Sequence, residues 1–260
     1  MMSLFPLPIF TDNYVWICRF EETRRAVIVD PGESAPVETY LAEQGLTLAG
    51  ILITHHHADH IGGVGALLQR WSVPVFGPAS TRIPQVTCPV ADGSIVQLEG
   101  LQWRVLEVPG HTREHVAYFS PTADGGPLLF CGDTLFAAGC GRMFEGTAPQ
   151  MQASLARLAR LPHETRVCCT HEYTLSNLKF AQVVLGEQQS LQQRLAKESA
   201  KRSVGVPTLP STIGEELATN PFLRWQDPVV VQSLQKVGRY AGGEAAQVFG
   251  ALRAWKDEFR

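Results

Sequence analysis

The chain has 260 residues, and 22 Lys and Arg against 25 Asp and Glu give a formal net charge of −3. So small and slightly acidic a charge argues against a general nucleic-acid binder, which needs a basic surface to displace counterions from phosphates. With 45% hydrophobic and 18% charged residues the chain is an ordinary globular protein, and the absence of an apolar run of about 18 residues argues against a transmembrane helix.

Short apolar runs bounded by Gly, Pro or Asp predict strands through the first two thirds of the chain. Their length, β-branched content and turn punctuation are typical of strands, and the runs are 26–29, 50–53, 73–76, 103–108, 116–119, 128–131 and 166–169. Helices are expected between some of them, at 37–44, at 61–71 and around Met151, Leu155 and Leu158. This mixture predicts an α+β fold in which helices cover sheets.

The composition changes near residue 172, after which strand patterns nearly vanish. Helices are expected at 180–185, 190–200 and 245–259, with a Pro-containing stretch at 204–211 between them. The chain therefore divides into a mostly β domain, residues 1–171, and a helical domain, residues 172–260.

A histidine cluster follows the predicted strand 50–53. It reads Thr54-His55-His56-His57-Ala58-Asp59-His60, which is the pattern H-x-H-x-D-H. In an extended loop His55 and His57 share one side, and a helix starting near Ala58 would project Asp59 and His60 from its first turn. Neutral imidazoles and carboxylates are ligands for Zn²⁺ and similar divalent ions. The cluster therefore predicts a metal site.

Three later strands also end at ligand-type residues. His111 follows 103–108, Asp133 follows 128–131, and His171 follows 166–169. Taken singly, each has an ordinary explanation as a turn residue, a cap or a surface histidine. Together with the H-x-H-x-D-H cluster they complete a set of seven ligand-type residues.

Six cysteines occur without a CxxC pair, and the first residues lack the basic and apolar regions of a signal peptide. We therefore expect reduced thiols in a cytoplasmic protein, each packed as a small buried hydrophobe.

These motifs resemble the metallo-β-lactamase superfamily, and within it the glyoxalase II, or hydroxyacylglutathione hydrolase, family. The resemblance covers nearly the whole chain. Beyond the seven ligand-type residues it includes Thr11-Asp12-Asn13-Tyr14, Val29-Asp30-Pro31-Gly32, Gly110-His111-Thr112, Cys131-Gly132-Asp133-Thr134-Leu135-Phe136, Gly139-Cys140-Gly141-Arg142, His171-Glu172-Tyr173-Thr174, Asn220-Pro221-Phe222-Leu223-Arg224 and the segment 253–259.

The resemblance implies a four-layer αββα sandwich with a C-terminal helical domain and a dinuclear metal site. One ion would be held by His55, His57 and His111, the other by Asp59, His60 and His171, and Asp133 would bridge the two. Zinc is expected, and iron(II) or manganese(II) also suits His/Asp sites.

The implied reaction is hydrolysis of S-(2-hydroxyacyl)glutathione, chiefly S-D-lactoylglutathione, to glutathione and D-lactate in methylglyoxal detoxification. A metal-bridging hydroxide would attack the thioester carbonyl, with Asp59 and Asp133 as catalytic carboxylates. The leaving thiolate needs no dedicated general acid, because the pKa of a thiol is only about 8.5.

The resemblance also implies contacts to glutathione, whose carboxylates suit Arg and Lys. The matching positions are Arg142, Tyr173, Arg253 and Lys256, and the last two share a face if the segment is helical. Phe144 replaces a Tyr found in some members, which removes one hydroxyl and with it a hydrogen bond of about 1 kcal/mol.

The remaining unusual polar residues are assigned supporting or surface roles. His56 occupies a variable position of the motif and is expected to bind no metal. His115 and Asp30 are expected to support ligands, Asp30 equally well as a turn carboxylate. Glu114 replaces a small residue common in the family, and His163 is expected on a surface loop.

Three alternative functions are weighed against hydrolysis. A mononuclear iron persulfide dioxygenase of the same superfamily would use His55, His111 and Asp133 alone, and the helical extension carrying Arg253 and Lys256 argues against it. A metallo-nuclease is disfavoured by the missing basic bias, and a non-catalytic binding module by the intact ligand set. We expect a monomer that binds a small-molecule thioester and neither nucleic acid nor membranes.

Overall fold

The structure is a computed structural model that describes residues 1–240 and 242–259. Contacts between Cα atoms divide the chain into two compact units, which are described separately. Unit 1 comprises residues 1–107, 114–132 and 168–171, and unit 2 comprises residues 108–113, 133–167 and 172–260.

Unit 1 contains a first mixed sheet in which the strands lie in chain order. Its strands are β1 (Met2–Ile9), β2 (Asn13–Phe20), β3 (Arg25–Val29), β4 (Thr47–Leu52), β5 (Val75–Pro78) and β6 (Cys88–Val90). β1, β2 and β3 pair antiparallel, and β3 to β6 pair parallel. β2, β3 and β4 are almost wholly buried, as their continuous apolar sequences require of strands covered on both faces.

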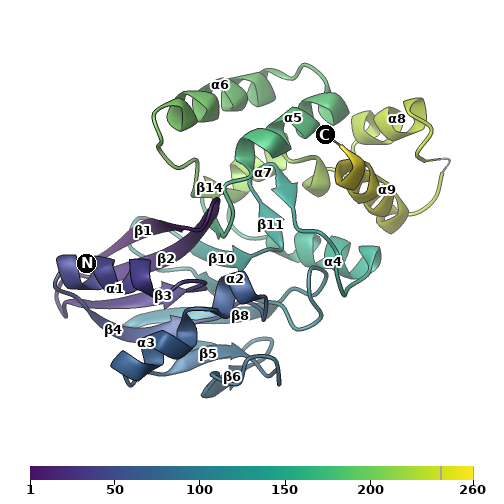
Figure 1. Cartoon of the computed structure of the whole chain (residues 1–260). Helices are drawn as coiled ribbons and strands as arrows, with labels where there is room; N and C mark the ends of the chain where they lie inside the picture. Colours follow the sequence, from purple (N-terminus) through teal and green to yellow (C-terminus); the bar gives the residue numbers. More distant parts are fainter. Residues whose placement is uncertain (241, 260) are drawn as a thin grey trace. The chain divides into compact units, whose positions relative to one another are not determined.

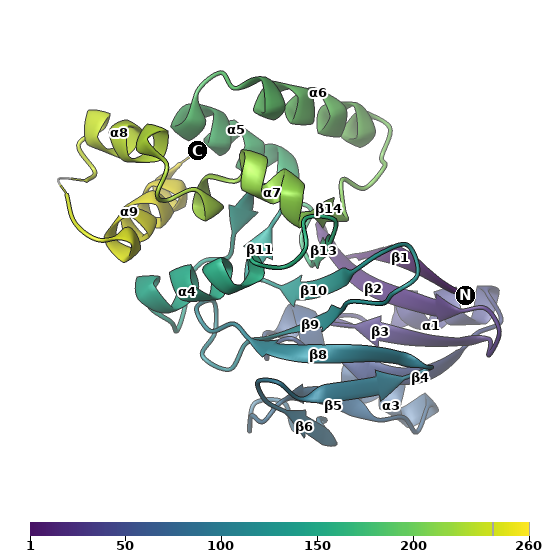
Figure 2. The same cartoon turned by 180° about the vertical axis from the view of Figure 1, so that it is seen from behind.

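Helices of unit 1 follow the strands of this sheet. They are α1 (Ala35–Glu43), α2 (Ala58–Ile61) and α3 (Val64–Arg70). α1 and α3 lie on one face of the first sheet (Figures 1 and 2). Val37 and Leu41 of α1 and Val64 and Leu67 of α3 are fully buried in the core cluster of this sheet, so the apolar stripe of each helix faces the strands.

The second sheet has the strand order β14-β13-β10-β9-β8-β7. Its strands are β7 (Ile95–Leu98), β8 (Leu101–Glu107), β9 (Val116–Ser120), β10 (Leu128–Gly132), β13 (Arg166–Cys169) and β14 (Ser211–Thr212). Cys168 and Cys169 of β13 belong to unit 1, and its first two residues pair with β14 within unit 2.

The two sheets pack face to face within unit 1 through aromatic side chains. The ring of Phe130 lies 6.3 Å from that of Trp16 on β2 and 5.2 Å from that of Trp103 on β8. The hydroxyl of buried Tyr118 on β9 donates to the carbonyl oxygen of Ile53 at 2.9 Å, which gives this polar tip a partner inside the sandwich.

Unit 2 is mostly helical. It contains the hairpin of β11 (Leu135–Phe136) and β12 (Gly139–Cys140), then α4 (Ala148–Leu158), α5 (Thr174–Leu185), α6 (Gln189–Ser203), α7 (Ile213–Thr219), the 3₁₀ helix η1 (Pro221–Leu223), α8 (Pro228–Lys236) and α9 (Ala245–Glu258) (Figure 2). A capping box of Thr147 and Gln150 begins α4. The buried ring of Phe180 on α5 contacts Phe222 of η1 and Trp255 of α9, which joins these helices in one core.

The α+β class with two sheets and a helical C-terminal part is confirmed. Among residues 1–240 and 242–259, no helix is long and apolar enough to cross a membrane. The division of the chain at residue 171 stays a prediction. The prediction of one helix over 61–71 was wrong, because Gly62 and Gly63 interrupt it. Their backbones pack on the segment after β3, where a Cβ at Gly63 would lie 2.7 Å from the carbonyl oxygen of Pro31.

Candidate metal centre and adjoining pocket

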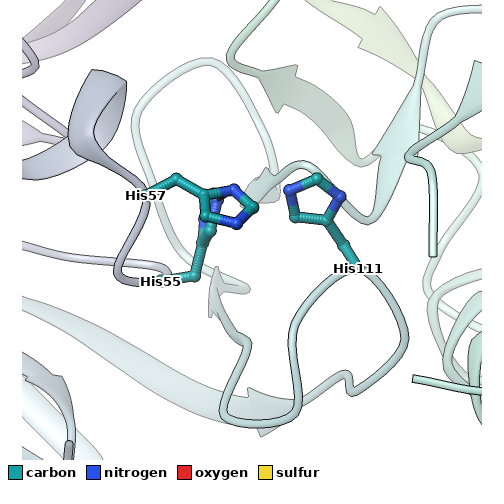
Figure 3. A group of neighbouring side chains, drawn as sticks. All are labelled: His55, His57 and His111. Carbon is teal, nitrogen blue, oxygen red and sulfur yellow. Dashed lines mark hydrogen bonds between the residues drawn. The ribbon is translucent and has the colours of Figure 1, made fainter. Parts of the chain in front are cut away.

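The loop after β4 presents two histidine rings together. His55 and His57 extend from this loop, as Figure 3 shows, and Nε2 of His55 lies 3.0 Å from Nδ1 of His57. His57 is also the N-cap of α2, so Asp59 and His60 project from the first turn of that helix. Both features confirm the arrangement that the spacing of the motif predicts. Figure 3 also draws His111, which comes from the loop after β8.

Asp59, His60 and His171 form a group that could hold a metal ion. Their ligand atoms all lie within 4.8 Å of one another. Oδ2 of Asp59 is 3.6 Å from Nε2 of His60 and 3.5 Å from Nε2 of His171. Two ligands that lie about 2.1 Å from a zinc ion at a tetrahedral angle are about 3.4 Å apart. The observed separations therefore suit ligands of a common ion.

A buried carboxylate orients part of this group. Asp30, which is 2% exposed, accepts hydrogen bonds from the backbone N–H of Thr54 at 2.8 Å and from its hydroxyl at 2.6 Å. Its Oδ2 also lies 3.0 Å from Nδ1 of His60. The predicted contact of Asp30 with a ligand-type histidine is confirmed.

The same contacts select the ring nitrogens that face a metal. The Thr54 hydroxyl donates a hydrogen bond to Asp30, so its oxygen accepts one from Nδ1–H of His55 at 3.1 Å. That bond leaves Nε2 of His55 without a proton and able to bind a cation. His115 is buried and stacks on the ring of His55 at 4.6 Å, which agrees with its predicted supporting role.

Unit 2 supplies the other two ligand-type residues, both nearly buried. Nε2 of His111 lies 3.4 Å from Oδ2 of Asp133, and Nδ1 of His111 donates to the backbone carbonyl of Arg142 at 2.8 Å. Gly141 permits this packing, because a Cβ there would lie 1.9 Å from the carbonyl oxygen of Asp133. This requirement explains the glycine before Arg142 in the Gly-Cys-Gly-Arg segment.

The chemistry of the donors fits divalent metal ions. In His60, His111 and His171 one ring nitrogen bonds to a carboxylate or carbonyl oxygen. Proteins fix metal-binding histidines in this way, because the bond sets the tautomer and turns the other nitrogen toward the metal. The carboxylates of Asp59 and Asp133 lie within 3.6 Å of the remaining nitrogens.

A cavity of about 450 Å³ opens within unit 2. All five residues expected to contact glutathione line it, and so do two ligand-type residues. The lining residues are His111, Asp133, Phe136, Cys140, Arg142, Phe144, Tyr173, Ser176, Asn177, Arg253, Lys256 and Phe259. The cavity therefore joins a cationic wall to two residues expected to bind metal.

Arg253 has a structural role in this wall. The side chain is 4% exposed, Nη1 donates to the carbonyl oxygen of Cys140 at 2.8 Å, and Nη2 lies 3.0 Å from a carboxylate oxygen of Asp257. The guanidinium also lies 5.0 Å from the centre of the Phe222 ring. Much of its hydrogen-bonding capacity thus serves to hold α9 against the β11–β12 hairpin.

Lys256 presents a more accessible cation. Its Nζ lies 5.7 Å and 5.6 Å from the ring centres of Phe180 and Phe259, and 3.4 Å from the hydroxyl of Ser176. Partial burial, and then the nearby positive charge of Arg253, lowers the pKa of Lys256 below its usual value. A bound anion would offset both effects.

The other two pocket residues are aromatic and exposed. Phe144 is 64% exposed, and its ring lies edge-on to His111 at 5.3 Å. Tyr173 is the N-cap of α5, and its ring meets Phe136 edge-on at 5.5 Å. Both therefore present exposed aromatic surface to a ligand in the cavity.

Sequence reasoning missed several residues of the site. Asp12 and Asn13 contact His171 and Asp59, and Ser176 and Asn177 line the cavity. Asp12 and Asn13 do lie in the Thr11-Asp12-Asn13-Tyr14 segment of the family resemblance. Their contacts join residues 159 and 46 positions apart, and local spacing carries no information on such contacts.

Comparison with known proteins defines the family. Residues 11–171 match the family model of the metallo-beta-lactamase superfamily, and residues 172–259 match that of the hydroxyacylglutathione hydrolase C-terminus. The chain is 49% identical over 259 residues to the hydroxyacylglutathione hydrolase of Hahella chejuensis, with 100% of both chains covered. It is 51% identical over 258 residues to that of Albidiferax ferrireducens, covering 99% of this chain and 100% of the relative.

Among solved structures, ETHE1 from Myxococcus xanthus is similar, with a TM-score of 0.64, 26% identity and 98% of each chain covered. A metallo-beta-lactamase from Staphylococcus aureus shares the fold, with a TM-score of 0.65 and 20% identity over 98% of this chain and 71% of that one. The full-length identity and the two adjoining family models agree: the chain belongs to the hydroxyacylglutathione hydrolase, or glyoxalase II, family of the metallo-β-lactamase superfamily.

Proposed function

We propose that the protein hydrolyses S-(2-hydroxyacyl)glutathione, chiefly S-D-lactoylglutathione, to glutathione and D-lactate, and so acts in methylglyoxal detoxification. The observation that carries this proposal is the cavity of unit 2, which His111 and Asp133 line together with Arg142 and Lys256. A substrate whose carboxylates bind Arg142 and Lys256 would extend its thioester toward His111 and Asp133. The full-length relatives named as hydroxyacylglutathione hydrolases support the same reaction.

The metal assignment forms part of this proposal. One ion would be held by His55, His57 and His111, a second by Asp59, His60 and His171, and Asp133 would bridge them. The oriented ring nitrogens and the spacing around Asp59 support it. We propose zinc in both positions, while His/Asp donors also accept iron(II) and manganese(II).

When bound, two such ions lower the pKa of a water and polarise a carbonyl oxygen. The side chains supply orientation and proton handling. The Asp59 carboxylate accepts a hydrogen bond from the amide of Asn13 at 3.0 Å, and in this proposal it would accept a proton from the attacking water. Since the leaving group is a thiol with a pKa near 8.5, no residue needs to protonate it.

The pocket residues bind and orient the rest of the substrate. Arg142 and Lys256 are assigned to the carboxylates of glutathione, because cations form charge-assisted hydrogen bonds with them. Tyr173 offers a hydroxyl, and Phe144 offers an apolar face beside His111. A persulfide dioxygenase is disfavoured, since relatives of about half-identical sequence are named as hydrolases.

We further propose a cytoplasmic monomer whose partner is the small-molecule thioester. None of the six cysteines, all of which lie in the described part of the chain, forms a disulfide bond, and five of them are buried, which accords with a reducing compartment.

A steady-state assay tests the function directly. The purified protein, loaded with two equivalents of zinc, should hydrolyse S-D-lactoylglutathione, and should hydrolyse a simple acyl-glutathione more slowly. Dialysis against a strong chelator should abolish turnover, and added zinc should restore it. A zinc-loaded protein with background rates on both thioesters would refute the proposal.

A further inference from the structure

Asp12, on the turn between β1 and β2, and Asn13, the first residue of β2, contact two of the three residues assigned to the second ion. We propose that Asp12 and Asn13 are positioning residues that set the affinity of the Asp59–His60–His171 site for its metal. The inference rests on the dinuclear site of the proposed function. All the residues that carry it lie in unit 1.

Asp12 holds the ring of His171. Oδ1 of Asp12 lies 2.9 Å from Nδ1 of His171, and the side chain of His171 is only 7% exposed. A carboxylate in this position accepts a hydrogen bond from Nδ1–H, which leaves Nε2 as the ligand atom and raises its basicity. That Nε2 is the atom 3.5 Å from Oδ2 of Asp59. The contact therefore directs His171 at the cluster.

Asn13 holds the carboxylate of Asp59. Its Nδ2 donates to Oδ2 of Asp59 at 3.0 Å, the same oxygen that faces His60 and His171. Asp59 lies on the four-residue helix α2, and its side chain is 40% exposed. The amide of Asn13 thus restricts the rotation of this partly exposed carboxylate.

The start of β2 is joined to the segment after β13 that carries His171. Asn13 forms an antiparallel β-bridge with His171, and the N–H of Tyr14 donates to the carbonyl oxygen of Thr170 at 2.7 Å. Two adjacent residues therefore hold ligands that lie 112 positions apart in the sequence, since 171 − 59 = 112. Asp30 holds the third ligand, His60, independently.

The test compares four variants of the full chain: Asp12→Ala, Asp12→Asn, Asn13→Ala and, as a control, Thr11→Ala. Thr11 is exposed on the same turn. Zinc affinity is measured by competition with a chromophoric chelator, and bound zinc is counted by elemental analysis after dialysis. Far-ultraviolet circular dichroism of the metal-free proteins checks that each variant is folded.

Asp12→Ala and Asn13→Ala should each lower the affinity for one of the two ions by about 10- to 100-fold, the range for residues that support metal ligands. The affinity for the other ion should stay unchanged. Asp12→Asn should bind the affected ion more tightly than Asp12→Ala, because its amide oxygen still accepts a hydrogen bond from Nδ1–H of His171. Thr11→Ala should match the wild type within about two-fold.

The inference fails if both Asp12→Ala and Asn13→Ala keep wild-type affinity for both ions. A wild-type protein that binds two ions and hydrolyses the thioester would in that case leave the proposed function intact. A wild-type protein that binds no zinc would overturn both. If Asp12→Ala does not fold, Asp12→Asn and Asn13→Ala decide the question by the same measurement.

Discussion

Replacing Glu216 by Gln should strongly destabilise unit 2, because Glu216 and Arg194 form a buried ion pair. Nη2 of Arg194 donates to Oε1 of Glu216 at 2.6 Å, and the two side chains are 2% and 0% exposed. Oε2 of Glu216 accepts from the N–H of Ala138 at 2.7 Å and from Nδ2 of Asn220 at 3.0 Å. The variant Glu216→Gln keeps the shape and removes the charge.

The magnitude follows from these contacts. A glutamine has one oxygen and one NH₂ group, so its NH₂ must face either the Arg194 guanidinium or the N–H of Ala138, and in both cases two donors meet. Removing one partner of a buried ion pair costs about 3–5 kcal/mol. A carboxylate oxygen of Glu215 remains 3.7 Å from Nε of Arg194, so we expect the lower end, about 3 kcal/mol.

Urea unfolding followed by circular dichroism at 222 nm measures this change, since unit 2 holds most of the helices. The double variant Arg194→Met with Glu216→Gln should recover about half of the loss, because the uncompensated cation is then absent. The reasoning is refuted if Glu216→Gln is within about 1 kcal/mol of the wild type, or if the double variant is less stable than Glu216→Gln alone.

The same substitution should raise KM for the thioester. Asn220 donates to the carbonyl oxygen of Gly139 at 2.9 Å, and Glu216 binds the N–H of Ala138. These contacts hold the β11–β12 hairpin, which supplies Phe136 and Cys140 to the cavity. An unchanged KM in a folded Glu216→Gln variant would show that the hairpin keeps its position without this network.

Three further outcomes are expected. Lys256→Ala should raise KM by about ten-fold, equivalent to about 1.4 kcal/mol, with little change in kcat. The control Lys179→Ala, which alters an exposed lysine of α5, should leave KM unchanged. Equal KM values for the two variants would remove Lys256 from the binding site. Phe144→Tyr should lower KM by about five-fold, if the added hydroxyl gains a hydrogen bond of about 1 kcal/mol, and a higher KM would show that the apolar face is needed. Asp227→Ala should lower the free energy of unfolding by about 1 kcal/mol at pH 7, since the carboxylate caps α8. The hydrogen bond from the N–H of Val229 lowers the pKa of Asp227 below its usual 3.8, so the stabilisation by Asp227 is present above pH 3.8 and is lost as the pH falls through the lower pKa of the folded state. A stability difference between variant and wild type that persists below that pH would contradict the assignment.

Local spacing determined the histidine loop. The alternation of His55 and His57 put both rings on one side, and the helix that begins at Ala58 placed Asp59 and His60 in its first turn. Each of these relations is set by neighbouring residues, so the sequence alone suffices. Short buried strands such as β3 and β13 were equally predictable, because turn residues bound them.

Patterns without clear periodicity were not predictable. β1 contains Pro6 and Pro8, β2 includes the polar residues Asn13 and Arg19, and the pairing of Trp16 with Val29 assigns β2 to the sheet. The interruption at Gly62 and Gly63 depends on the backbone after β3. Whether a segment forms a strand, or a helix continues, depended here on a neighbour distant in the sequence.

The support of the site was decided by tertiary structure alone. His171 receives its carboxylate from Asp12, 159 residues earlier, and the adjacent Asn13 donates to Asp59. These pairings follow from the β-bridge between Asn13 and His171, which fixes one register among several. The residue types of the proposed ligands can be read from the sequence, whereas the direction of each ring nitrogen depends on which distant oxygen the fold brings to it.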